Sequence, residues 1–271
     1  MAKISDEERG KYFELIKPYK ATIHEILKRE QNVALFIRND PQTAAFKRLS
    51  LADEMLNLSS NYIIINGISQ SVLKVKNEEA LNDARKSLYK SVIYLEEVVS
   101  NYLDSPFSEY EDRLVEIENF DETHRFLLAR KMGLAIELLI NAYGDNTKWK
   151  WSFVELEGRY ATVVKNTLNL RNAVANTDPR SPDYEPTVYH LRLIKKLLMQ
   201  SADRYREKYE LSTNRIDDFK QGINFLAALR RLHIIVGDRE DAEIIKKKLD
   251  IWAVKLESDL RKQEELGLKK T

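Results

Sequence analysis

Apolar residues recur at intervals of three and four along most of the chain, the spacing that places side chains on one face of an α-helix. The clearest run follows Asn77, where Leu81, Leu88 and Leu95 stand seven residues apart. Such heptad spacing suits a helix that packs nearly parallel or antiparallel to its neighbours. The runs together predict an all-α protein of about nine helices, a helical bundle or a short array of stacked helical hairpins, with no significant sheet.

Capping residues locate the ends of several predicted helices. Asp40 followed by Pro41 has the pattern of an N-cap before a proline at the first helical position. We therefore expect a second helix to begin there and to run to about Val75. Asp121 and Gly144 bracket another run as its N-cap and its C-terminal glycine. Because apolar residues surround most of this later helix, we expect it to lie centrally in the fold.

Two tryptophans alternate with lysines in the sequence NTKWKWSF, residues 146–153. This alternation fits a strand that stacks on nucleic acid, a membrane anchor, or the start of a helix. Trp149 leads a series of apolar residues at spacings of three and four through Tyr160, which predicts a helix with a buried face. Trp151 would then lie about 200° around the helix from Trp149, so the two rings cannot form one stacking platform. We expect both rings to pack in the interior and the lysines to lie over apolar surface.

Proline usage bears on the domain organisation. Three of the six prolines fall within residues 177–186. Clustered prolines oppose both helix and sheet, so this stretch is the one candidate for a linker or a long crossover. The chain of 271 residues is therefore predicted to form a single all-α domain, 1–271, or two parts, 1–176 and 187–271, that the crossover joins.

The charge balance and the absence of cysteine narrow the classes of function. The 44 basic and 43 acidic residues leave a net charge of +1, which argues against nucleic-acid binding driven by counterion release without removing it. With no cysteine, the chain has no disulfide, no thiolate metal site and no cysteine nucleophile. The N-terminal sequence lacks the apolar segment of a signal peptide, and no apolar run is long enough to span a membrane. We expect a cytoplasmic protein without a membrane partner.

Motifs for catalysis or for cofactor binding are missing from the sequence. The four histidines fall in separate predicted helices, and none has a Glu-x-x-His or His-x-x-x-His spacing that would turn two metal ligands to one face. The chain contains neither a glycine-rich phosphate loop nor a Gly-x-Ser-x-Gly nucleophile turn. The sequence therefore predicts no catalytic residue, no metal site and no cofactor, and we expect that the protein is not an enzyme.

One helix carries a narrow polar line on an otherwise apolar surface. Between Phe126 and Tyr143, the polar positions at spacings of three and four are Arg130, Gly133, Glu137 and Asn141. This line is either the only solvent-facing stripe of that helix or one side of a groove, where Glu137 would need a cation. The predicted helix 214–236 has a weaker line, made of Asn224 and Arg231 with Arg230 and His233 beside it. Opposed lines of this kind would form a salt-bridge network or a pocket for an anionic ligand.

One predicted hairpin resembles a single tetratricopeptide unit. In the sequence LHIIVGDREDAEIIKKKLDIW, Gly237 and Asp238 stand at the turn, and Ala242 falls where that family keeps a small residue. The sequence departs from the family at Arg230, where a small residue is usual, and at Lys246, where an aromatic is usual. The resemblance implies stacked helical hairpins that present a surface to another protein.

These patterns support three functional hypotheses. The first is a non-catalytic helical protein–protein interaction or scaffold module, with another protein or a second copy of the chain as its partner. The alternative is a binder of an anionic ligand, such as a phosphorylated segment, RNA or a small acid, through the basic C-terminal helices. The residues predicted for that role are Arg192, Lys195, Lys196, Arg204, Arg230 and Arg231. The third is a helical enzyme whose residues converge only in three dimensions around Glu137 or His233.

Overall fold

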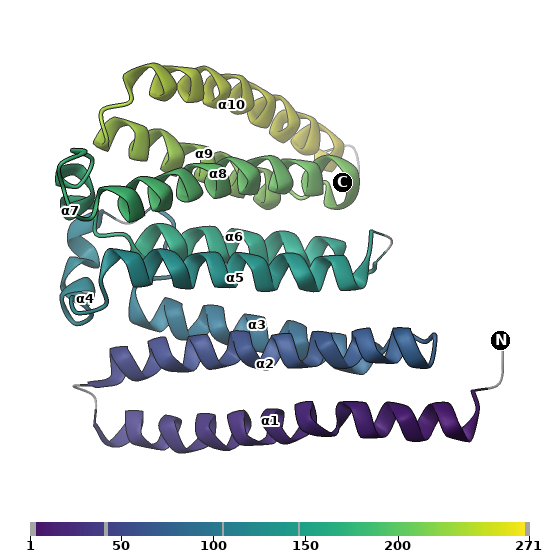
Figure 1. Ribbon diagram of the computed structural model, residues 1–271. Coiled ribbons are helices and arrows are strands. Elements are labelled where there is room, and N and C mark those ends of the chain that lie inside the picture. Colours follow the sequence, from purple (N-terminus) through teal and green to yellow (C-terminus); the bar gives the residue numbers. More distant parts are fainter. Residues whose placement is uncertain (1–3, 41–42, 105, 146, 269–271) are drawn as a thin grey trace. The chain divides into compact units, whose positions relative to one another are not determined.

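A computed structural model describes residues 4–40, 43–104, 106–145 and 147–268 of the chain (Figure 1). Over these residues the protein is all-α, with ten α-helices and no strand, which confirms the predicted fold class. The sequence predicts about nine helices because apolar periodicity needs several turns to become visible. The additional helix is α7 (Leu170–Ala175), a short segment that begins where the Asn169 side chain accepts hydrogen bonds from the backbone N–H groups of Arg171 and Asn172.

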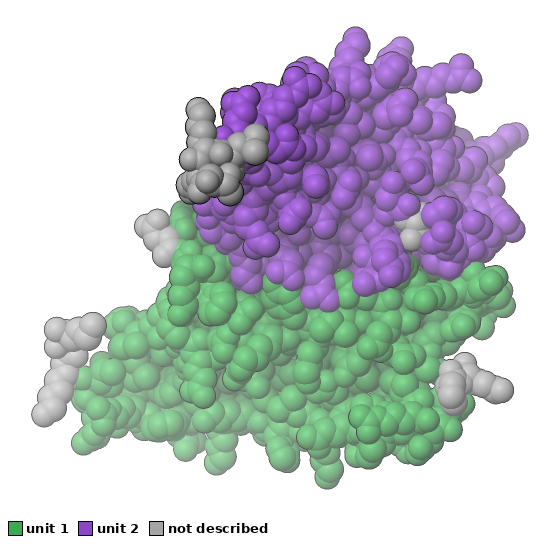
Figure 2. All heavy atoms as spheres, turned by 180° about the vertical axis from the view of Figure 1, so that it is seen from behind, with its two compact units in different colours: residues 1–100, 112–150 green, residues 101–111, 151–271 purple. Residues whose placement is uncertain are grey.

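The chain divides into two compact units (Figure 2). Unit 1 comprises Met1–Ser100 and Asp112–Lys150, and unit 2 comprises Asn101–Glu111 and Trp151–Thr271. The proline-rich stretch 177–186, the predicted crossover, lies inside unit 2, and its last residues, including Pro186, already belong to a helix that begins at Tyr184. The chain instead crosses between the units after Ser100, after Glu111 and after Lys150.

Unit 1 is built from long helices whose apolar faces meet. Its helices are α1 (Asp6–Asn39), α2 (Ala44–Val72), α3 (Glu78–Val98), α4 (Glu111–Val115) and α5 (Glu122–Tyr143). Leu81, Leu88 and Leu95 of α3 are buried, as their heptad spacing predicts. The Asn77 side chain caps α3 by accepting a hydrogen bond from the backbone N–H of Ala80. The three consecutive isoleucines Ile63, Ile64 and Ile65 lie within α2 and are helical.

The predicted start of the second helix is wrong. Asp40 is the C-cap of α1, where its backbone N–H donates to the carbonyl of Phe36, and α2 begins only at Ala44. The side chain of Asp40 accepts hydrogen bonds from Thr43 and Lys47 instead of capping a helix, and Pro41 lies outside the described residues. Helix α2 ends at Val72 because Lys74 adopts a left-handed backbone conformation with φ 56°.

Unit 2 contains the C-terminal helices. They are α6 (Lys150–Thr167), α7, α8 (Tyr184–Lys208), α9 (Ile216–Ile235) and α10 (Arg239–Leu268), with a 3₁₀ turn η2 (Phe107–Glu109) and a π-helical turn η3 (Tyr209–Thr213). The turn expected at Gly237 and Asp238 is present, and Gly237 has φ 85°, a conformation that favours glycine. No helix among the residues described has the length and apolar character needed to cross a membrane.

The helix predicted from NTKWKWSF begins one residue after Trp149, so only the second of the two tryptophans belongs to it. Helix α6 begins at Lys150, so Trp149 lies just before it rather than in its first turn. The Trp149 ring is half-buried in unit 1, where the guanidinium of Arg85 lies 4.1 Å from the ring centroid. Trp151, in the first turn of α6, is also half-buried. The rest of the predicted stripe is buried and confirms the helical interpretation.

Candidate functional site

Unit 2 contains a pocket of about 560 Å³ between its helices and a segment from earlier in the chain. We call this segment, Asn101–Glu111, the strap. Helix α6 contributes Gly158, Arg159 and Thr162, helix α8 contributes Tyr205, and helix α9 contributes Gln221, Asn224 and Phe225. The strap contributes Tyr102, Asp104 and Glu109 among others.

The aromatic wall of the pocket depends on a glycine. The rings of Tyr205 and Phe225 stack with their centroids 5.6 Å apart and an interplanar angle of 21°. A Cβ atom at Gly158 would lie 2.8 Å from Cε2 of Tyr205 and 3.1 Å from Cζ of Phe225. The absence of a side chain at Gly158 therefore lets both rings lie directly against the backbone of α6.

The strap is fixed to unit 2 by polar contacts. Nδ2 of Asn166 donates to the carbonyl oxygen of Tyr102 at 3.0 Å, and Arg231 pairs with Asp104 at 3.1 Å. Arg171 pairs with Glu111 at 2.8 Å, at the other end of the strap. These contacts hold one side of the pocket in place even though it comes from a distant part of the sequence.

A buried lysine lies close to the strap. Nζ of Lys165 donates to Oδ1 of Asn166 at 2.9 Å and lies 5.5 Å from the centroid of the Tyr110 ring. Burial lowers the pKa of Lys165 to about 8, and the nearby charge of Asp104 opposes this shift. Lys165 therefore contributes a polar group that holds Asn166 in position, although its charge is poorly solvated.

Polar groups of the pocket bond to neighbouring residues of unit 2. Its hydroxyl and amide groups bond to neighbours, since Thr162 donates to the carbonyl of Gly158 and Asn224 donates to Gln221. The titratable side chains that line the pocket include Asp104, Glu109 and Tyr205. The charged lining residues are Asp104, Glu109 and Arg159, so the acidic groups outnumber the basic ones and the lining has no excess of positive charge for an anion.

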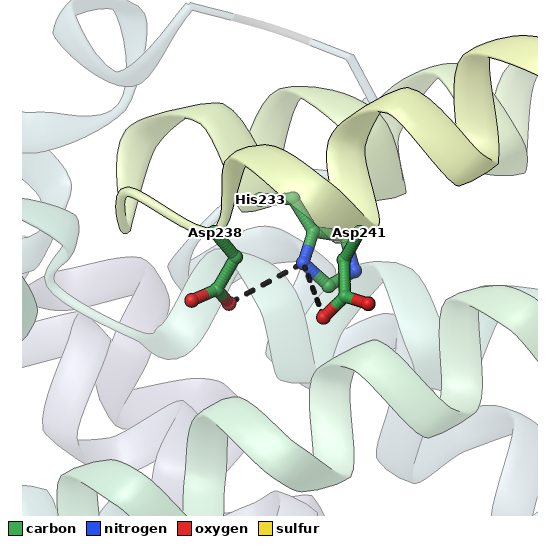
Figure 3. A group of neighbouring side chains, drawn as sticks. All are labelled: His233, Asp238 and Asp241. Atoms are coloured by element: carbon green, nitrogen blue, oxygen red, sulfur yellow. Dashed lines mark hydrogen bonds and ion pairs between the residues drawn. The ribbon is translucent and has the colours of Figure 1, made fainter.

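A second cluster lies at the turn between α9 and α10 (Figure 3). Nδ1 of His233 lies 3.3 Å from Oδ2 of Asp238 and 3.8 Å from Oδ2 of Asp241, and Figure 3 shows the three side chains pointing toward one another. An imidazole nitrogen with two carboxylates could hold a divalent cation. The ammonium of Lys195, however, pairs with Asp238 and lowers the pKa of that carboxyl group. The contacts therefore favour an ion-pair network that fixes the α9–α10 turn.

The predicted polar line on α5 is exposed. Arg130, Glu137 and Asn141 all lie on the exposed surface of unit 1, and Gly133 is half-buried. The guanidinium of Arg130 lies over the Phe126 ring of the same helix, 5.5 Å from its centroid. These positions match the solvent-facing interpretation of the line. The predicted residues of α9 belong to unit 2, where Asn224 lines the pocket and Arg231 holds the strap.

Most of the predicted basic residues of unit 2 contact groups of the same unit. Lys195 pairs with Asp238, and Arg204 pairs with Glu157 at 3.3 Å and with Glu207 at 3.1 Å. Arg192 lies over the ring of Tyr189, 5.9 Å from its centroid. Lys196 is exposed, and Nε of the half-buried Arg230 has no hydrogen-bond partner among the described residues. The carboxylate partners reduce the positive charge that these helices offer to an anionic ligand.

Sequence reasoning missed an apolar feature of α5. Leu127, Leu134 and Leu138 are 49%, 57% and 42% exposed, and they lie beside the predicted polar line. Their spacing of seven and four residues is visible in the sequence. Because leucine and alanine occur all around this helix, the spacing alone does not say which leucines face the core.

Comparisons with known proteins identify a family for this chain. No curated protein and no solved structure matches the chain. A family profile matches residues 8–260, which run from α1 into α10 and so include both units. The chain belongs to the TP0443 family.

Proposed function

We propose that the protein is a non-catalytic helical interaction module and that α5 of unit 1 binds a helix of a partner protein. The observation that carries this proposal is the exposed row of Leu127, Leu134 and Leu138 on α5. Single exposed apolar residues are common on protein surfaces, but an apolar row with a charged border is typical of an interaction site.

The geometry of α5 fits a helical partner. At 100° per residue, the three leucines share an arc of about 100° with Arg130, Glu137 and Asn141. Apolar side chains at a spacing of seven and four residues form a straight row along one face, which is how helices pack side by side. Arg130 and Glu137 border the leucines and lie about two helical turns apart. They can therefore favour a partner helix that places an acidic residue beside Arg130 and a basic residue beside Glu137.

The leucines are expected to supply most of the binding free energy. Complete burial of one leucine side chain contributes about 1.5–3 kcal/mol, and these leucines retain a large part of their surface for a partner to cover. The polar residues beside them contribute less, since exposed ion pairs are worth about 0–1 kcal/mol. Replacement of a leucine in the row should therefore weaken binding more than replacement of Arg130 or Glu137.

The test is site-specific photo-crosslinking in cells that express the chain naturally. A photoreactive residue at Leu134 should cross-link one partner, and the same residue at Leu211, an exposed position of η3, should not. Leu127→Glu with Leu138→Glu should reduce the cross-linked product at least tenfold, which corresponds to about 1.4 kcal/mol. Leu211→Glu is the matched control. Equal cross-linking from both positions, or a product that survives the double substitution, would refute the proposal.

A further inference from the structure

We propose that α10 pairs in parallel and in register with α10 of a second copy of this chain. The contact surface is the outer face of α10, which we define by Ile244, Ile251 and Val254. This surface belongs to unit 2 and does not involve α5, so the inference does not depend on the function proposed above.

Helix α10 uses only one of its faces within unit 2. Ala242, Ile245 and Trp252 are buried on that face. On the opposite side, Ile244, Ile251 and Val254 are 61%, 69% and 69% exposed. Two isoleucines seven residues apart and a valine three residues further on occupy the a, a and d positions of a heptad pattern. The outer face therefore has the apolar spacing of a helix that lacks its partner.

Charged residues border the outer face in a regular order. In the heptad frame, the g positions are the exposed acidic residues Glu243, Asp250 and Glu257. The e positions are the basic residues Lys248, Lys255 and Lys262. Between residues 243 and 262, one border of the face is thus acidic and the other is basic, whereas the e position before them is Asp241.

This order of charges identifies the partner and its orientation. In a parallel in-register pair, each g residue lies close to the e residue five positions later in the other helix. All three of these contacts, 243 with 248, 250 with 255 and 257 with 262, join an acid to a lysine. An antiparallel pair would place acid beside acid and lysine beside lysine. The helix is therefore complementary to a parallel copy of itself.

Two features limit the strength of the pair. Lys248 already contacts Asp203 of its own unit at 2.8 Å, and Lys255 and Lys262 contact Asp259 at 3.0 Å and 3.6 Å. These lysines are partly exposed, and exposed ion pairs of this kind are weak, so each ammonium can be shared with the second copy. Lys247 and Arg261 at d positions and Ser258 at an a position interrupt the apolar row. Polar residues at such positions fix register at a cost in stability, so the expected dimer is reversible and depends on concentration.

The first experiment is sedimentation equilibrium of the full chain over a wide concentration range. The mass should rise from 31.7 kDa toward twice that value as the concentration increases. Ile251→Lys should keep the chain at 31.7 kDa, and Leu211→Lys, at an exposed position outside α10, should dimerise like the parent. A parent chain that stays monomeric at every concentration, or an Ile251→Lys variant that still dimerises, would overturn the proposal.

The second experiment tests the orientation, and the absence of cysteine from the chain makes it direct. In a parallel in-register pair, the two copies of residue 258 face each other, so Ser258→Cys should form an intermolecular disulfide on mild oxidation. Ala253→Cys, at an exposed position of α10 away from the outer face, is the control and should cross-link several-fold less. Equal cross-linking at both positions would rule out the parallel register, as would its absence at position 258 in a chain that dimerises.

Discussion

At the residue scale, Lys165 couples the stability of unit 2 to pH. This side chain is 6% exposed, and burial lowers its pKa to about 8 from the value of 10.5 expected for an exposed lysine. Between these pH values the unfolded chain binds more protons than the folded chain, so the free energy of unfolding increases as the pH rises. Below pH 8 both states are protonated, and the whole penalty for burying the charge is present. The shift corresponds to roughly 3 kcal/mol.

The first prediction concerns the substitution Lys165→Met. We expect the rise in the free energy of unfolding between about pH 8 and 10.5 to disappear in this variant, because the titrating group has been removed. At pH 7 the variant should be at least as stable as the parent, since the charge penalty of roughly 3 kcal/mol offsets the hydrogen bond from the ammonium to Asn166, which is worth about 1.5–3 kcal/mol. Denaturant unfolding at a series of pH values measures both effects.

The control is Lys196→Met, at an exposed lysine of α8, which should keep the parent's rise of the free energy of unfolding with pH. A rise that persists in Lys165→Met would contradict the argument.

At the element scale, two glycines inside helices have opposite environments. A Cβ at Gly158 of α6 would lie 2.8 Å from the ring of Tyr205, whereas a Cβ at Gly67 of α2 would have no neighbour within 4 Å. We expect Gly67→Ala to increase the free energy of unfolding by about 1 kcal/mol, because alanine is the better helix former. Gly158→Ala gains the same propensity but displaces a packed ring, at a cost of about 1–3 kcal/mol. Thermal unfolding of the two variants should shift the midpoint in opposite directions, and an increase in both would contradict the packing argument.

The helices themselves show how far the sequence predicts the structure. The cap at Asp121 was predicted because a polar side chain there precedes a long periodic run. Asp40 was assigned to the wrong helix because the same residue type can begin one helix or end the one before it, and only the hydrogen bonds distinguish the two. The strap was not predicted, since its contacts with Asn166 and Arg231 join residues that are far apart in the chain. Periodicity reports one helix at a time and carries no information about such pairings.

At the scale of the whole molecule, neither unit is a single continuous stretch of the chain. The chain leaves unit 1 after Ser100, contributes the strap to unit 2, returns to unit 1 at Asp112, and leaves it again after Lys150. Unit 2 is therefore built from two separate chain segments, and its integrity depends on the contacts that hold the strap. Cleavage between α5 and α6 would place the strap and the rest of unit 2 on different pieces of the chain.

This connectivity gives the last prediction. A protease site inserted after Asp145 should allow the folded chain to be cut into two pieces that stay together, because the strap on the first piece remains bound to the second. Asp104→Ala with Glu111→Ala removes the partners of Arg231 and Arg171, and should lower the denaturant concentration at which the cut pieces separate. Each of these partly exposed pairs is worth about 0.2–1 kcal/mol, so the expected effect on association is roughly fivefold. Asp178→Ala is the matched control, since Asp178 pairs with Arg180 on the same piece.

Separation becomes dependent on protein concentration once the chain is cut, so dilution makes a small loss of strap affinity measurable. Pieces that separate at the same denaturant concentration with and without the two carboxylates would show that these ion pairs do not hold the strap.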